Sequence, residues 1–214
     1  MTSRERVLAA IDHRQPDRVP IDFGGTPTSG IMASAVAALR RVLKLSNADE
    51  PVRIIEPYQM LGEVDAEMRQ AIGIDTVALP ARGNMFGFEN ADWKPWTTFD
   101  NTQVLVPGKF NTEPEPDGSI LMHPRGDRSF PPSAKMPAGG FYFDSIPRQK
   151  PIDDATLSVE DNLEEFGRTS DENLAHLQRE SERLRRETEC AIVATGPGTA
   201  FGDIALVPAP MLPD

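Results

Sequence analysis

Residues 17–30 read DRVPIDFGGTPTSG and combine an alternating segment with a pair of glycines and the start of a helical pattern. Apolar and polar side chains alternate in residues 18–23, which predicts a short buried strand. Its apolar members are Val19, Ile21 and Phe23. Gly24 and Gly25 end this strand, because paired glycines allow positive φ and close backbone approach. Residues 31–43 then carry apolar side chains at helical spacing, so the stretch predicts one β/α unit.

The glycine-rich loop of this unit has two interpretations. In α/β folds the loops after the carboxyl ends of the strands build the ligand site, so the loop is a candidate wall of such a site. The alternative is a plain turn in which the glycines serve only the backbone geometry.

Composition excludes several classes of partner and compartment. The 214 residues suffice for one domain with a sizeable core. A net charge of −11 argues against nucleic acids and anionic membranes as main partners, because both require a basic surface. Cys190 is the single cysteine, so there is no disulfide framework and a reducing cytoplasm fits best. No apolar run is long enough for a membrane span, and the charged N-terminus is no signal peptide.

The rest of the first third also predicts helices and strands in alternation. Thr2 and Glu5 form a capping box, which starts a helix that runs from Ser3 to about His13. A strand is expected at residues 52–55. A helix at 60–72 with Gly73 at its C-cap position and a strand at 74–79 follow.

The middle of the chain differs, because residues 83–150 carry no helical period and predict a β-meander inserted into the α/β core. Aromatic side chains are expected to pack this insertion down, with stacking on a ligand as the alternative. They are Trp93, Trp96, Phe99, Phe141, Tyr142 and Phe143.

The last third returns to the α/β pattern after an acidic loop at 151–165. Thr169 and Glu172 form a second capping box, which predicts a helix to about Glu187. Its expected buried side chains are Leu174, Leu177 and Leu184. A buried strand at 190–195 and a second glycine-rich loop at 196–199 follow.

Four stretches in this order resemble the uroporphyrinogen decarboxylase superfamily, and most closely its branch that includes cobalamin-dependent methyltransferases. They read SRERVLAAIDHRQPDRVPIDFGGT, EPYQMLGEVDAEMRQAIGIDTVALP, MPAGGFYFD and ETECAIVATGPGTAFGDIAL. The resemblance implies a (β/α)₈ TIM barrel. Residues 1–214 would form a single α/β domain, the N-terminal portion of such a barrel, with 83–150 as its β-rich insertion. Three or four barrel strands cannot close a barrel, so we expect either a longer protein cut near Asp214 or completion by another chain.

The charges that the decarboxylases use are missing at the matching positions. Those enzymes hold acidic tetrapyrroles with an arginine-containing motif after the first strand, where this chain reads FGGTPTSG. Their functional aspartate near the end of the second strand is replaced by Leu79 or Pro80. Arg82 is the nearest possible substitute. The resemblance therefore favours methyl transfer over decarboxylation.

The resemblance also implies zinc and a corrinoid (cobalamin) for a full-length family member, since the methyltransferase branch binds zinc through His-x-Cys and a later Cys. This chain has no His-x-Cys, so no metal site and no cofactor is expected within it. His13 and His176 are interpreted as surface residues, His123 as structural, and Cys190 as a core residue.

The substrate-binding candidates are the polar and glycine residues expected at the ends of the barrel strands. They are Asp22, Gly24, Gly25, Gln59, Thr195, Gly196 and Gly198. They would offer backbone N–H groups, an amide and a carboxylate to a small molecule. In the alternative interpretation Asp22 caps a turn.

Three functions remain open, and catalytic residues are not identified for any of them. The first is methyl transfer between a corrinoid and a small acceptor, with a corrinoid protein as a candidate partner. The present chain alone is then expected to be inactive. The second is uroporphyrinogen decarboxylation in porphyrin synthesis. The third is a non-catalytic binding module or partner chain.

Overall fold

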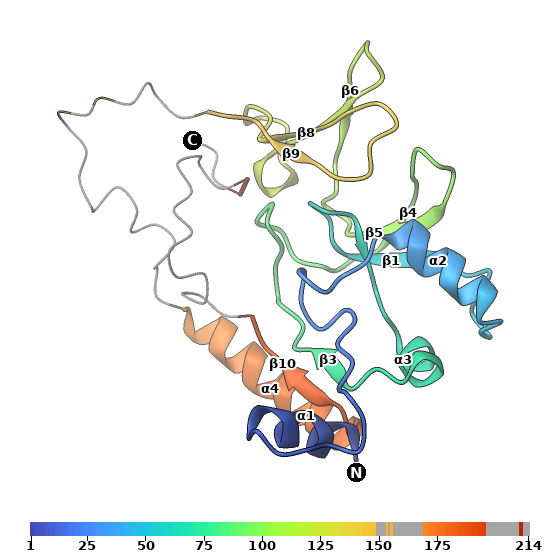
Figure 1. Cartoon of the computed structure of the whole chain (residues 1–214). Helices are drawn as coiled ribbons and strands as arrows, with labels where there is room; N and C mark the ends of the chain where they lie inside the picture. Colours follow the sequence, from blue (N-terminus) through green and yellow to red (C-terminus); the bar gives the residue numbers. More distant parts are fainter. Residues whose placement is uncertain (149–152, 154, 156–168, 196–209, 212–214) are drawn as a thin grey trace.

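The computed structural model describes residues 1–148, 153, 155, 169–195 and 210–211. These residues form a mixed α/β structure in which four α-helices accompany three separate small sheets (Figure 1). The described residues form no closed barrel. The expected acidic loop at 151–165 and the glycine-rich loop at 196–199 lie outside the described residues, apart from 153 and 155. No described helix has the length and apolar character needed to cross a membrane.

Helix α1 (Ser3–Ile11) starts as its capping box predicts. The Thr2 side chain accepts from the Glu5 N–H, and the Glu5 carboxylate accepts from the Thr2 N–H. The helix ends two residues before the expected His13, which takes a positive φ of 55° beyond it.

The predicted buried strand at residues 18–23 is wrong. This segment belongs to no sheet, and Val19 is 79% exposed. Pro20 has no N–H to donate to a ladder, and the Ile21 N–H donates to the Asp75 side chain instead of to a neighbouring strand. The alternation of apolar and polar side chains could not show that the backbone N–H of Ile21 donates to a side chain and not to a neighbouring strand.

The hydrophobic core joins helix α2 (Ala33–Val42) and a four-stranded sheet in the order β2-β1-β5-β4 to buried residues of the middle region, among them Met122, Met136 and Phe143. Strand β1 is Val52–Glu56, as predicted, and it pairs antiparallel with β2 (Leu61–Gly62) and parallel with β5 (Gln103–Val106). Strand β4 (Lys94–Thr97) completes the sheet beside β5.

Two expectations change with this sheet. Because β4 and β5 pair in the sheet of β1, residues 83–150 are not a separate insertion throughout. The helix expected at 60–72 is also too long: α3 spans only Ala66–Ile72, with Asp65 as its N-cap, because residues 61–62 form β2. Gly73 does end α3 in the left-handed conformation, at φ 78°, as predicted.

Strand β3 (Thr76–Ala78) confirms the strand expected at 74–79 in a shorter form, and it pairs parallel with β10 (Ala191–Val193). Helix α4 (Asp171–Glu187) precedes β10. Its N-cap is Ser170 and not Thr169, because the Ser170 hydroxyl accepts from the Asn173 N–H. Leu184 is buried as expected, whereas Leu174 is 53% exposed.

The β-rich part of the middle region is an antiparallel sheet in the order β6-β7-β8-β9. Its strands are β6 (Glu113–Pro114), β7 (Ile120–Met122), β8 (Ala134–Met136) and β9 (Asp144–Ser145), with the short helix η1 (Pro124–Gly126) after β7. This sheet lies at the end of the molecule away from α1, β3 and β10 (Figure 1).

The aromatic packing expected here is only partly right. Phe143 is fully buried against Phe86 and Phe110, and Trp96 packs edge-on against Phe110. Three of the aromatic side chains expected to pack are instead exposed by 38% or more, because they face outward from turns and loops: Phe99, Phe141 and Tyr142. The ring of Trp93 lies under the guanidinium of Arg53, 5.8 Å from its centroid.

Candidate functional site

Three segments run in the same direction at one end of the molecule. Residues 18–23 run alongside β3 in the same direction. The Asp75 N–H donates to the Ile21 carbonyl at 2.8 Å, and Thr76 Oγ1 donates to Asp22 Oδ1 at 2.5 Å. β3 in turn pairs parallel with β10 from Thr76 to Ala78. The chain leaves these segments at one edge, at residues 24–25, 79–80 and 194–195. We call this the carboxyl edge.

Asp22 is the best-placed polar residue at the carboxyl edge. Its Oδ1 accepts from Thr76 Oγ1 and from the Gly25 N–H, at 2.5 and 3.1 Å. Its Oδ2 accepts no hydrogen bond from the part of the chain that the structure describes, and the residue is exposed. One oxygen is therefore held while the other faces solvent. Thr76, which orients Asp22, lies 54 positions away and was missed by the sequence analysis.

The two glycines serve the geometry of the loop. Gly24 has φ 86°, and a Cβ there would lie 2.8 Å from Val64 Cγ2, while a Cβ on the buried Gly25 would collide with the Asp22 carboxylate. Their N–H groups donate inside the loop, to the Ser29 carbonyl and to Asp22. These contacts agree with the plain-turn interpretation, and they leave Asp22 rather than backbone N–H groups facing solvent.

The remaining candidates are spread more widely. Thr195 is exposed beyond β10 at the carboxyl edge. Gln59 is exposed in the turn between β1 and β2, in a different sheet, where its N–H donates to Glu56. Gly196 and Gly198 lie outside the described residues. The structure thus brings Asp22, Gly24, Gly25 and Thr195 to one edge and does not bring Gln59 to it.

The start of α4 is tied to the carboxyl edge by two side chains. His176 Nε2 bonds the Pro80 carbonyl at 3.0 Å, so this histidine is part-buried and not the free surface residue expected. Arg82 forms ion pairs with Glu172 and, at 2.8 Å, with Glu89. These carboxylates raise the pKa of Arg82. The sequence analysis named Arg82 as the nearest possible substitute for the charges that bind acidic substrates, but its guanidinium is already paired with Glu172 and Glu89.

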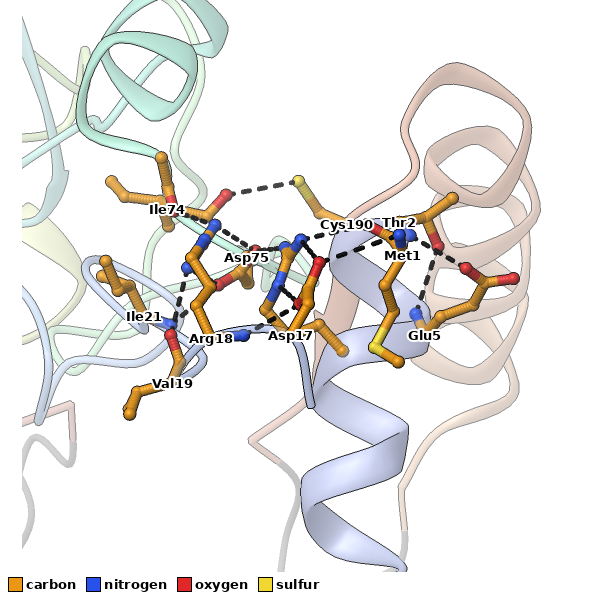
Figure 2. Close-up of polar contacts among 12 residues, drawn as sticks. Met1, Thr2, Glu5, Asp17, Arg18, Val19, Ile21, Ile74, Asp75 and Cys190 are labelled. Atoms are coloured by element: carbon orange, nitrogen blue, oxygen red, sulfur yellow. Dashed lines mark hydrogen bonds and ion pairs between the residues drawn. The ribbon is translucent and has the colours of Figure 1, made fainter. Parts of the chain in front are cut away.

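The opposite, amino end of β3 carries a network of charges around Asp75 (Figure 2). Asp75 is fully buried; Arg6 donates to its Oδ1 at 2.5 Å, and Arg18 contacts both carboxylate oxygens at 2.7 and 2.9 Å. Arg6 also forms a bidentate pair with Asp17 at 2.6 and 2.9 Å. The network fastens α1 and residues 17–21 to β3, so its role is structural.

The pKa values in this network lie below the ordinary range for aspartate. Burial raises the pKa of Asp75, but the bonds from the Ile21 N–H and from Arg18 and Arg6 outweigh burial and lower it. The bidentate bond from Arg6 lowers the pKa of Asp17. Both carboxylates therefore stay ionised in the folded protein at a pH where they bind protons in the unfolded chain.

We expect the protein to lose stability in acid for this reason. A carboxylate whose pKa is lower in the folded state than in the unfolded chain stabilises the folded protein at pH values above the unfolded-state pKa, which is about 3.9 for aspartate. This stabilisation is lost as the pH falls from about 5 towards 2. Urea unfolding at neutral pH and in this acid range measures the change. Glu56 changes the acid dependence in the opposite direction: burial raises its pKa, so protonation of Glu56 in acid favours the folded state. The Asp75→Ala variant should show a shallower acid dependence; an equal slope in both proteins would contradict the assignment.

The described residues do not fit a zinc site. No three His, Cys, Asp or Glu side chains among them are grouped to hold a metal ion. Cys190 Sγ lies 3.9 Å from the Ile74 carbonyl, at the amino end of β3 and β10 (Figure 2). The buried His123 bonds the Phe130 carbonyl through Nδ1 and Glu113 through Nε2, at 2.8 and 3.1 Å, which agrees with a structural role.

Comparison of this chain with protein-family models, with curated proteins and with solved structures finds no match.

Proposed function

We propose that this chain supplies the first part of a (β/α)₈-barrel enzyme and binds a small molecule at the carboxyl edge. The observation that carries the proposal is the parallel run of residues 18–23, β3 and β10, with a glycine-rich turn and Asp22 where the chain leaves them. Ligand sites of barrel enzymes lie at this end of their strands. The activity we propose is that of the family resembled in sequence: methyl transfer from a corrinoid carried by a partner protein to a small acceptor.

The role proposed for Asp22 follows from its hydrogen bonds. Thr76 Oγ1 and the Gly25 N–H fix Oδ1, so Oδ2 is held in one direction and accepts a proton or a hydrogen bond from a bound acceptor. The exposed hydroxyl of Thr195 is a second polar contact at the same edge. These groups bind and orient a ligand.

No step of this proposal passes through zinc, because the described residues hold no donor set for it. Decarboxylation is the second candidate and is less well supported. Arg82, the cation considered for binding an acidic tetrapyrrole, is engaged by Glu89 and Glu172. A clamp for several carboxylates requires cations that are free to reach them.

The test uses the protein purified from its source with whatever chains accompany it. Methyl transfer is followed as loss of methylcobalamin absorbance in the presence of thiol or folate acceptors. Asp22→Ala should lower the rate by about tenfold or more, because a charge-assisted hydrogen bond is removed. Asp12→Ala, which removes a carboxylate from the exposed Arg14 pair, is the matched control and should leave the rate unchanged.

Two results would contradict this function. Conversion of uroporphyrinogen to coproporphyrinogen would replace methyl transfer with decarboxylation. Absence of both activities, with a ligand still bound in an Asp22-dependent way, would favour a non-catalytic binding chain.

A further inference from the structure

An open hollow of about 920 Å³ lies beside the β6-β7-β8-β9 sheet, and its described lining contains no residue of the carboxyl edge. Its described lining comes from two loops, one between β5 and β6 and one between β7 and β8. The side chains used below are Lys109, Asn111, Arg125, Asp127, Arg128 and Phe130. This volume is within the usual range for small-molecule sites, about 300–1,000 Å³.

The two loops are fastened to each other by a short chain of hydrogen bonds. Lys94 Nζ donates to the Gly108 carbonyl at 2.8 Å and to Asn111 Oδ1 at 2.9 Å. Asn111 Nδ2 then donates to the Gly126 carbonyl at 3.0 Å. A Cβ on Gly126 would collide with the Lys109 carbonyl, so this glycine permits the close approach. The lining is therefore held in place before any ligand binds.

Arg125 occupies a costly backbone conformation within this lining. Its φ is 57°, in the left-handed region that long side chains rarely adopt, and its N–H donates to the Phe86 carbonyl at 2.7 Å. Asparagine or glycine would adopt this conformation more readily. A strained arginine that the surrounding loops hold in a hollow is a feature typical of binding sites.

The charge of the hollow is opposite to that of the chain. The chain carries −11, yet three cations and one carboxylate belong to the described lining. Arg128 donates to the Thr112 carbonyl, and Asp127 accepts from the Ser129 N–H. The side chains of Lys109 and Arg125 have no hydrogen-bond or ion-pair partner among residues 1–148, 153, 155, 169–195 and 210–211. Two unpaired cations in one hollow are complementary to an anion.

We propose that this hollow binds a small organic anion carrying phosphate or carboxylate groups. The guanidinium of Arg125 and the ammonium of Lys109 contact the anionic oxygens, and Arg128 adds a third positive charge. The ring of Phe130 lines the same hollow and offers an apolar surface to the organic part of the ligand. This site shares no residue with the carboxyl edge and does not depend on the function proposed there.

Calorimetric titration of the 214-residue chain with pyrophosphate and with citrate tests the proposal, at one fixed ionic strength. We expect at least one of them to bind at millimolar concentration or below, and the tighter one identifies the ligand as phosphate-like or carboxylate-like. Arg125→Asn and Lys109→Gln should each weaken that binding by about tenfold. Asparagine tolerates φ 57°, so Arg125→Asn should fold at least as well as the original chain.

Lys44→Asn is the matched control, because Lys44 is exposed, has φ 54° and lies outside the lining of the hollow. It removes one positive charge at the same kind of backbone position and should change affinity by no more than about twofold. Failure of both anions to bind at millimolar concentration would overturn the proposal. So would an equal loss of affinity in Lys44→Asn, which would show a general effect of charge.

Discussion

Replacing Asp75 with alanine should lower the free energy of unfolding by about 3 kcal/mol. Asp75 is fully buried and accepts from Arg6, Arg18 and the Ile21 N–H. Removal of the carboxylate leaves a largely buried guanidinium and a backbone donor without their partner, which is the costly way to break a buried ion pair. The expected loss is at the lower end of the usual range because Arg6 keeps its bidentate bond to Asp17.

Urea unfolding at neutral pH measures this loss. Asp12→Ala is the control: it removes a carboxylate from an exposed pair with Arg14 on the same N-terminal segment, and should leave the midpoint almost unchanged. Equal midpoints for Asp75→Ala and the original protein would mean that the network does not hold α1 and residues 17–21 on β3.

Replacing Phe143 with alanine should lower the free energy of unfolding by about 3–5 kcal/mol. The Phe143 ring is fully buried, with its centroid 5.4 Å from that of Phe86 and 6.0 Å from that of Phe110. Its N–H donates to the Tyr58 carbonyl at 2.8 Å. The side chain thus fills the core where the end of the β6-β7-β8-β9 sheet meets the turn after β1, and alanine would leave a cavity there.

Tyr142→Ala provides the control from the neighbouring position. Tyr142 is 55% exposed, so its removal should change the unfolding midpoint only slightly. Similar losses for the two variants would show that Phe143 is not the anchor between these parts of the structure. Near-ultraviolet circular dichroism should also change in Phe143→Ala, since three buried rings lie in contact there.

The parts of the fold that the sequence predicted correctly depend on neighbouring residues. The capping box of Thr2 and Glu5 and the left-handed Gly73 involve contacts within one helical turn. The strand at β1 is likewise apparent from its own residues. Such local signals do not require knowledge of which segments pair, so periodicity and capping rules were sufficient for them.

The errors come from contacts between residues far apart in the chain. The expected strand at 18–23 lost a ladder donor to Asp75, 54 positions beyond Ile21. The expected helix at 60–72 lost its first part to β2, which pairs back onto β1. The apolar side chains of residues 60–65 were compatible with a helix and with a strand, and the pairing of β2 with β1 decided for the strand.

The candidate site shows the same division. Asp22 was identified from its expected place near the end of a barrel strand, and Gly24 and Gly25 from their local sequence. Thr76, which fixes Asp22, and the bond of His176 to Pro80, 96 positions away, depend on how the segments assemble. The cationic hollow was missed because Lys109 and Arg125 lie in separate loops and form no motif.

The pairing of β3 with β10 has a consequence for how the protein is made. Thr76 lies opposite Ala191, so the strand that contains Thr76 has no β10 partner until more than a hundred further residues have been translated. At about 5–20 residues per second, the nascent chain presents this open strand edge for roughly 6–23 s. An unpaired edge of Thr, Val and Ala is a template for pairing with other chains. The yield of folded protein should therefore depend on chaperone supply during synthesis.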